Sequence, residues 1–126
     1  METRQKIFLS LAILTGIFIF YISTLSNPPN PQPGSNWVSI AYHFGIFFLL
    51  ALFLILSTNF SKKQLWFVYI FSTLYAISDE FHQYFVPYRS CNLPDIMTDA
   101  SGVVVAFLLY FMIRKIMDAQ KTNLDS

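Results

Sequence analysis

The feature that most constrains the fold is a run of 19 apolar or small residues at positions 7–25, which follows Arg4 and Lys6. A helix of this length spans the roughly 30 Å hydrocarbon layer of a bilayer. A basic start before an apolar run is also typical of a signal peptide, but this run is too long and no A-x-A-like cleavage site follows it. We therefore expect a retained membrane anchor.

Composition favours a membrane location for the rest of the chain as well. Only 12% of the 126 residues are charged and the mean hydropathy is +0.50, whereas charged residues make up roughly 25% of soluble chains. The net charge of +1 and the lack of a Lys/Arg run exclude a basic nucleic-acid-binding face. GxxxxGK[ST], GxGxxG and CxxC motifs are absent, and the single Cys91 cannot form an internal disulfide.

Further apolar segments predict an all-α integral membrane bundle of four transmembrane helices. The second span starts at Trp37, an amphipathic residue that prefers the membrane interface. Residues 65–77 are too few to span alone, so we expect the third helix to continue through the acidic residues toward Val86. Leu93 and Pro94 mark the start of the fourth helix. The predicted spans are residues 7–25, 37–56, 65–86 and 95–117.

Residues 27–36 connect the first two spans. They contain four prolines and no charge, which precludes a helix and favours a stiff outer loop. A PxxP-type ligand segment is the alternative interpretation.

The basic residues predict the orientation of the bundle. With four spans, every Lys and Arg except Arg89 falls on one side of the membrane, namely Arg4, Lys6, Lys62, Lys63, Arg114, Lys115 and Lys121. The positive-inside rule then places both termini in the cytoplasm. We expect a multi-pass cell-membrane protein whose polar stretch, residues 78–99, faces the extracytoplasmic side.

This polar stretch holds four of the seven acids and one of the two histidines. Counting about 1.5 Å per residue from the cytoplasmic helix ends places His43, Asp79 and Asp99 at one level, roughly 21 to 24 Å up. A lipid-facing charge near the membrane centre costs about 2.5 to 3.5 kcal/mol, so we expect these groups to face one another in a wet, outward-opening niche. The candidates for this polar site are His43, Asp79, Glu80, His82, Gln83, Arg89, Asp95 and Asp99.

Helical spacing groups the candidates of the third helix by face. Asp79 shares a face with His82 and Gln83 through i, i+3 and i+4 spacing. Glu80 points about 100° away from Asp79 and needs a separate partner, for which Arg89 is the only nearby cation.

On the fourth helix, Asp95 and Asp99 share a face with Gly102 and Ala106. The two small residues form a small-xxx-small pair that would let a neighbouring helix approach closely. Polar groups and close packing are therefore expected on the same side of this helix.

Each candidate also has a purely structural interpretation. His43 alone could be a satisfied interior histidine, and Asp79 and Asp99 could be helix caps at a water interface. Arg89 could be a solvated charge or a contact to lipid phosphate. The shared level of the ionisable residues favours a common site.

The chain resembles the VanZ-like membrane domain, a family named for a teicoplanin-resistance protein. The resemblance rests on the run from Asp79 to Arg89, on Asp95 and Gly102, and on the pair His43-Phe44. It covers nearly the whole chain, residues 1–126, as a single domain. The chain departs from the family pattern at Asp99, where Asn is usual, at Ala106, where Gly is frequent, and at Ser39-Ile40, which replace Asp-Lys.

The resemblance implies a small multi-span envelope domain, in some members linked to reduced glycopeptide susceptibility, whose molecular activity is not established. The first functional hypothesis is an outward pocket that binds a polar headgroup, such as that of a lipid-linked envelope intermediate, with Arg89 on phosphate. The carboxylates and His82 would orient this ligand or a bridging divalent cation.

Two other classes of function remain open. A membrane enzyme acting on a lipid phosphate would use His43 or His82 as general base and the carboxylates for a divalent metal, although no ligand spacing selects one. Proton-coupled transport would need an oligomer, because four short spans are few for a transporter. A module with only a packing role is a further alternative.

Overall fold

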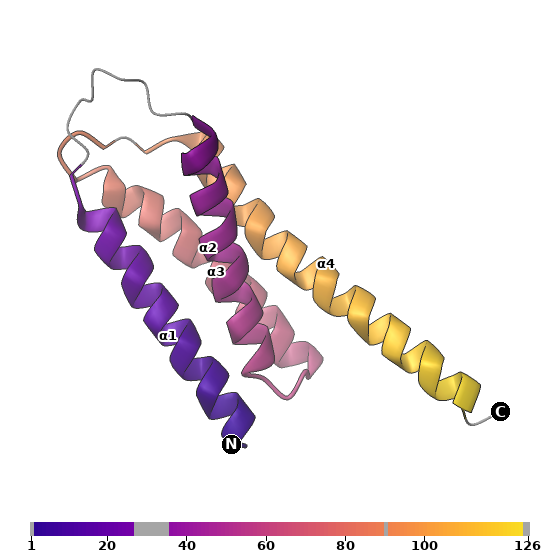
Figure 1. Cartoon of the computed structure of the whole chain (residues 1–126). Coiled ribbons are helices and arrows are strands. Elements are labelled where there is room, and N and C mark those ends of the chain that lie inside the picture. The colour runs from indigo at the N-terminus through magenta and orange to yellow at the C-terminus, as the bar shows by residue number, and fades with distance from the viewer. Residues whose placement is uncertain (1, 27–35, 90, 125–126) are drawn as a thin grey trace.

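The computed structural model describes residues 2–26, 36–89 and 91–124, which form four α-helices (Figure 1). The helices are α1 (Thr3–Thr24), α2 (Asn36–Leu56), α3 (Lys62–Gln83) and α4 (Leu93–Leu124). The all-α prediction is therefore confirmed. The predicted proline-rich loop falls at residues 27–35, outside the described residues.

Successive helices run in opposite directions, so the N and C termini lie at the same end of the bundle (Figure 1). Hydrogen bonds at both ends agree with this arrangement. At the end that holds the termini, Arg4 of α1 donates to the carbonyl oxygens of Leu56 and Thr58, where α2 ends. At the opposite end, Arg89 donates to the carbonyl oxygen of Ile22 near the end of α1, over 3.1 Å.

Helix α3 continues through the acidic residues, as predicted, but it ends at Gln83 and not near Val86. Proline disfavours helical backbone at the preceding residue, and Pro87 follows Val86 directly. Tyr88 then adopts a positive φ of 64°. The chain therefore turns back over the end of the bundle before α4 begins.

Helix α4 begins at Leu93, with Pro94 in its first turn as predicted, but it continues to Leu124 and not only to about residue 117. No glycine or proline follows Met117 to stop it, and Ala119, Gln120 and Lys121 are good helix formers. Side chains 111–123 are exposed, and this part of α4 projects beyond the other helices (Figure 1).

Among the described residues, three helices are long and apolar enough to cross a membrane. They are α1, Trp37–Leu56 of α2 and Leu93–Asn123 of α4. Helix α3 is not one of them, because its last turns carry Asp79, Glu80 and other polar residues. The chain is a membrane protein on this criterion, and the crossing of α3 stays a prediction.

Helix α2 lies at the centre of the bundle. It packs against each of the other three helices and most extensively against α4, whereas the backbones of the described parts of α1 and α4 do not approach each other closely. The core contains Phe47, Ala51 and Ile55 of α2 together with Val103 and Ala106 of α4, all almost inaccessible to solvent. Most large apolar side chains on the outer faces are exposed, as expected for helices that contact lipid.

Gly102 allows the close contact between α2 and α4. A Cβ atom at this position would collide with the carbonyl oxygen of Phe44 and would lie 3.0 Å from the backbone nitrogen of Phe48. Ala106, one turn further along, is fully buried. The predicted small-xxx-small contact is therefore confirmed, with α2 as the neighbouring helix.

Candidate functional site

A buried polar contact joins His43 of α2 to Asp99 of α4. His43 Nδ1 lies 2.9 Å from Asp99 Oδ1, and Asp99 is fully buried. Local packing explains the contact, since Gly102 lies one turn from Asp99 and brings α4 against the backbone of Phe44, the neighbour of His43. Two segments far apart in the sequence thereby place an imidazole beside a carboxylate.

Helix α3 contributes two more carboxylates to the same place. The Gln83 amide nitrogen donates to Asp79 Oδ2 over 3.0 Å and to Glu80 Oε1 over 3.2 Å. Glu80 Oε1 also lies 3.9 Å from His43 Nδ1, and Glu80 Oε2 accepts from the backbone N–H of Asn92 over 3.3 Å. Both acidic side chains are buried. Glu80 has separate partners, as expected, but they are Asn92 and His43 and not Arg89, and it shares Gln83 with Asp79.

Arg89 belongs to a different set of contacts. Its guanidinium donates to the carbonyl oxygens of Ile22 in α1 and of Leu25, which directly follows α1, over 3.1 and 3.2 Å, and to Gln83 Oε1 over 3.1 Å. An arginine can only donate, so this last bond orients the Gln83 amide with its NH₂ group toward the carboxylates. In the described part of the chain, no Lys or Arg forms an ion pair with Asp79, Glu80 or Asp99.

Asp95 completes the group from the first turn of α4. Two triads of side chains have ligand atoms within 4.8 Å of one another. The first triad is His43, Glu80 and Asp95, and the second is Asp79, Glu80 and Asp99. Glu80 belongs to both triads. We refer to the combined set as the polar cluster, which consists of His43, Asp79, Glu80, Gln83, Asp95 and Asp99.

Like Arg89, His82 is a candidate that lies outside the polar cluster. Its ring packs against Phe20 of α1, with the ring centroids 4.8 Å apart. Its Nε2 atom is buried without a hydrogen-bond partner in the described structure. The buried Ser23 hydroxyl lies near Asp79, a neighbour that no sequence pattern indicates.

The polar cluster is closed and not the wet niche that we expected. Glu80 and Asp99 have no exposed surface, and Asp79 and His43 are 7% and 5% exposed. Asp95 is only half-buried, so the surface at Asp95 is the side from which a ligand can approach.

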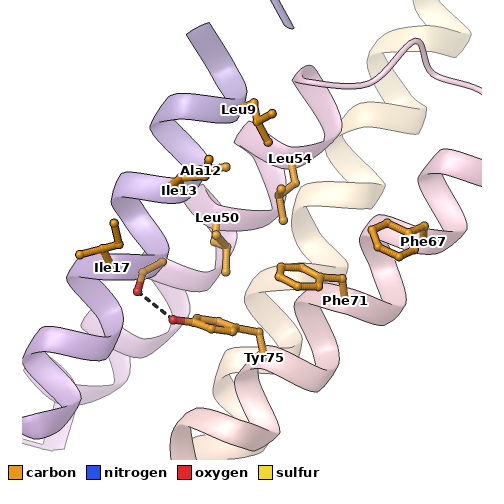
Figure 2. Close-up of a pocket in the computed structure, with 10 residues that line it drawn as sticks. Leu9, Ala12, Ile13, Ile17, Leu50, Leu54, Phe67, Phe71 and Tyr75 are labelled. Carbon is orange, nitrogen blue, oxygen red and sulfur yellow. Dashed lines mark hydrogen bonds between the residues drawn. The ribbon is translucent and has the colours of Figure 1, made fainter. Parts of the chain in front are cut away.

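An apolar cavity of about 360 Å³ lies between α1, α2 and α3 (Figure 2). Tyr75 is at one end of it, and its hydroxyl donates to the carbonyl oxygen of Gly16 over 2.8 Å. Phe67 and Phe71 of α3 line the same cavity and share with Tyr75 a spacing of four residues. Continued by four, this spacing reaches Asp79 and Gln83, so the cavity and the polar cluster lie along a single i±4 ridge of α3.

A comparison with protein-family models decides which family the chain falls in. The model described as VanZ/LLP1 matches residues 3–114. The chain belongs to the VanZ/LLP1 family. No curated protein and no solved structure matched it. The VanZ resemblance inferred from residues 79–89 is thus confirmed across all four helices, and the polar cluster lies within the VanZ/LLP1 region.

Proposed function

We propose that this VanZ/LLP1 protein is a multi-pass envelope membrane protein whose polar cluster binds the headgroup of a lipid or lipid-linked ligand on the outer side of the membrane. In this proposal α3 crosses the membrane in addition to α1, α2 and α4, and both termini are cytoplasmic. The ligand class includes lipid-linked cell-envelope intermediates, which would connect the protein to glycopeptide susceptibility.

The distribution of positive charge supports the orientation. Arg4 and Lys62 lie at the end of the bundle that holds the termini, and Arg114, Lys115 and Lys121 are in the second half of α4, which leads to that end. Arg89 follows α3 at the opposite end, beside the polar cluster. The positive-inside rule assigns the end rich in Lys and Arg to the cytoplasm.

The observation that carries the ligand class is the ridge of α3 that joins the apolar cavity to the polar cluster. An amphipathic ligand needs a polar site near the membrane surface and an apolar site deeper in the hydrocarbon. Tyr75 and Asp79 are one helical turn apart, so a ligand whose headgroup lies beside Asp95 could extend its hydrocarbon chain along α3 toward Phe71 and Phe67.

The role that we propose for Arg89 differs from the contact with a headgroup phosphate that we expected from the sequence. Three of its N–H groups already bind Ile22, Leu25 and Gln83, and an arginine has five. We assign it the task of orienting Gln83 and holding the end of α1, while the carboxylates and His43 face the headgroup.

Lipid co-purification tests this function. The protein is extracted from its membranes in mild detergent, and bound lipids are quantified by mass spectrometry for the wild type and for Asp79→Asn with Glu80→Gln. We expect at least one polar lipid to be recovered with the wild type and to fall about tenfold in the double variant, because two charged contacts are lost.

Asp118→Asn is the matched control, since it makes the same change at an exposed position of α4. Its lipid recovery should equal that of the wild type. Equal recovery of every lipid from all three proteins would contradict the proposal.

A further inference from the structure

Three carboxylates of the polar cluster approach one another, and among the described residues no Lys or Arg side chain lies between them. One oxygen from each of Asp79, Glu80 and Asp99 lies within 4.8 Å of the others, and all three residues are at least nine-tenths buried. Their described partners are the Gln83 amide, the Asn92 backbone N–H and the His43 ring. Buried carboxylates at this spacing repel one another strongly unless something positive lies between them.

Asp99 supplies a second and independent observation. Its Oδ1 atom contacts His43, but Oδ2 has no hydrogen-bond partner among the described residues although Asp99 has no exposed surface. An orphaned carboxylate oxygen within a protein costs free energy unless a ligand contacts it. The free oxygen belongs to the same carboxylate whose atoms lie near those of Asp79 and Glu80.

The donor set selects the kind of ligand. Three carboxylates attract a cation and repel a bare phosphate, and oxygen donors favour hard divalent ions over zinc or copper. Two donors on one ion cannot be further apart than twice the metal–oxygen distance, which is about 4.6 to 5.2 Å for Ca²⁺ and about 4.0 to 4.2 Å for Mg²⁺. All three pairs of oxygens lie within 4.8 Å, so small side-chain adjustments would bring them onto one divalent ion.

We propose that Asp79, Glu80 and Asp99 bind a hard divalent cation, with His43 hydrogen-bonded to Asp99 from outside the ligand set. A histidine in this position fixes the orientation of a ligating carboxylate. The cation would also bind the phosphate oxygens of a headgroup that approaches from the surface near Asp95. This second part rests on the proposed function, whereas the cation site itself does not.

Thermal unfolding of the detergent-purified protein tests the site. After treatment with EDTA and removal of the chelator, the midpoint is measured with Ca²⁺, Mg²⁺ or Mn²⁺ and without added metal. We expect at least one ion to raise the midpoint of the wild type by about 5 °C or more at saturation, since a ligand that binds only the folded state stabilises it. Asp99→Asn should lose this shift, and Asp118→Asn, the same change on the exposed part of α4, should keep it.

Equilibrium dialysis against Mn²⁺ provides a measurement that does not depend on a folded variant. We expect about one Mn²⁺ per wild-type chain, displaced by Ca²⁺. No thermal shift with any of the three ions together with no bound Mn²⁺ would overturn the proposal. An equal shift in a folded Asp99→Asn protein would overturn it too. Stabilisation by acid with no response to any of the metal ions would also overturn it, since protons and not a cation would then neutralise the carboxylates.

The outcomes separate the cation site from the proposed function. A metal response in the wild type with unchanged lipid recovery in the Asp79→Asn, Glu80→Gln protein would support the cation site and contradict the proposed headgroup binding. Loss of lipid from the double variant without any metal response in the wild type would contradict the cation site and support the proposed headgroup binding.

Discussion

Asp99 links α4 to α2 within the polar cluster. It is fully buried in α4, with one oxygen 2.9 Å from His43 Nδ1 and the other without a partner in the described structure. Burying a carboxylate costs several kcal/mol unless a charged or hydrogen-bonding partner compensates. Asp99 departs from the VanZ pattern, in which Asn is usual at this position, and the structure shows that the departure falls at the contact between α2 and α4.

A double-mutant cycle measures the contact between His43 and Asp99. We expect His43→Ala to lower the free energy of unfolding by about 0.5 to 3 kcal/mol more in the wild type than in the Asp99→Asn background, because the two side chains touch. Reversible unfolding of the four proteins in mixed micelles gives the values. Additive effects, within about 0.5 kcal/mol, would show that the contact contributes nothing.

The sequence predicted part of the polar cluster at the residue scale and failed where side-chain length and loop geometry decide. Helix counting placed His43, Asp79 and Asp99 at one level, and the structure brings them together. The partners of Glu80 were not predicted, because helical spacing fixes only the Cα–Cβ direction and a flexible glutamate side chain can reach groups on either side. The partners of Arg89 were missed because the positive φ of Tyr88, which sends the chain back toward α1, has no clear signal in the sequence.

At the scale of the helices, the approach of α4 to α2 determines whether the polar cluster forms. Gly102 is predictable from sequence as part of a small-xxx-small pair, but the pair does not reveal which helix it contacts. The structure identifies α2, and with it the neighbour of His43.

Two alanine substitutions test this contact. Gly102→Ala adds a methyl group that meets the backbone of Phe44 and Phe48, whereas Gly45→Ala, also within a helix, adds one where no atom lies within 4 Å. We expect Gly102→Ala to destabilise the protein by about 1 to 3 kcal/mol through overpacking. Gly45→Ala should be neutral or stabilising by up to about 1 kcal/mol, because alanine favours helix. Equal melting temperatures for the two variants would contradict the close approach.

At the end of the bundle that holds the termini, a basic residue has a structural role besides its effect on topology. From the sequence, Arg4 contributes only its positive charge to the predicted orientation. In the structure it caps the end of α2 and lies 4.9 Å from the ring centre of Phe60, and the neighbouring Gln5 donates to the side chain of Asn59. These contacts depend on the turn between α2 and α3, whose Phe60 has a positive φ of 59°, so no local pattern predicts them.

For the whole molecule, the unusual element is α3. Unlike α1, α2 and α4, it is not apolar enough on its own to be recognised as a membrane-crossing helix. It contacts all three of the others, which surround its polar residues and keep Asp79 and Glu80 away from lipid. We therefore expect α3 to cross the membrane as part of the bundle, and the four-span topology depends on it.

The central claim, a polar cluster buried at the outer end of a four-span bundle, is tested most directly by cysteine labelling. Cys91, the single cysteine of the chain, is exposed between α3 and α4 beside the polar cluster, and Lys63 is exposed at the start of α3. In right-side-out membrane vesicles, a membrane-impermeant maleimide should label Cys91 in the wild type. The same reagent should label Lys63→Cys in a Cys91→Ser background only after permeabilisation. Labelling of both positions from one side would show that α3 does not cross, and labelling of Lys63→Cys alone in sealed vesicles would place the polar cluster in the cytoplasm.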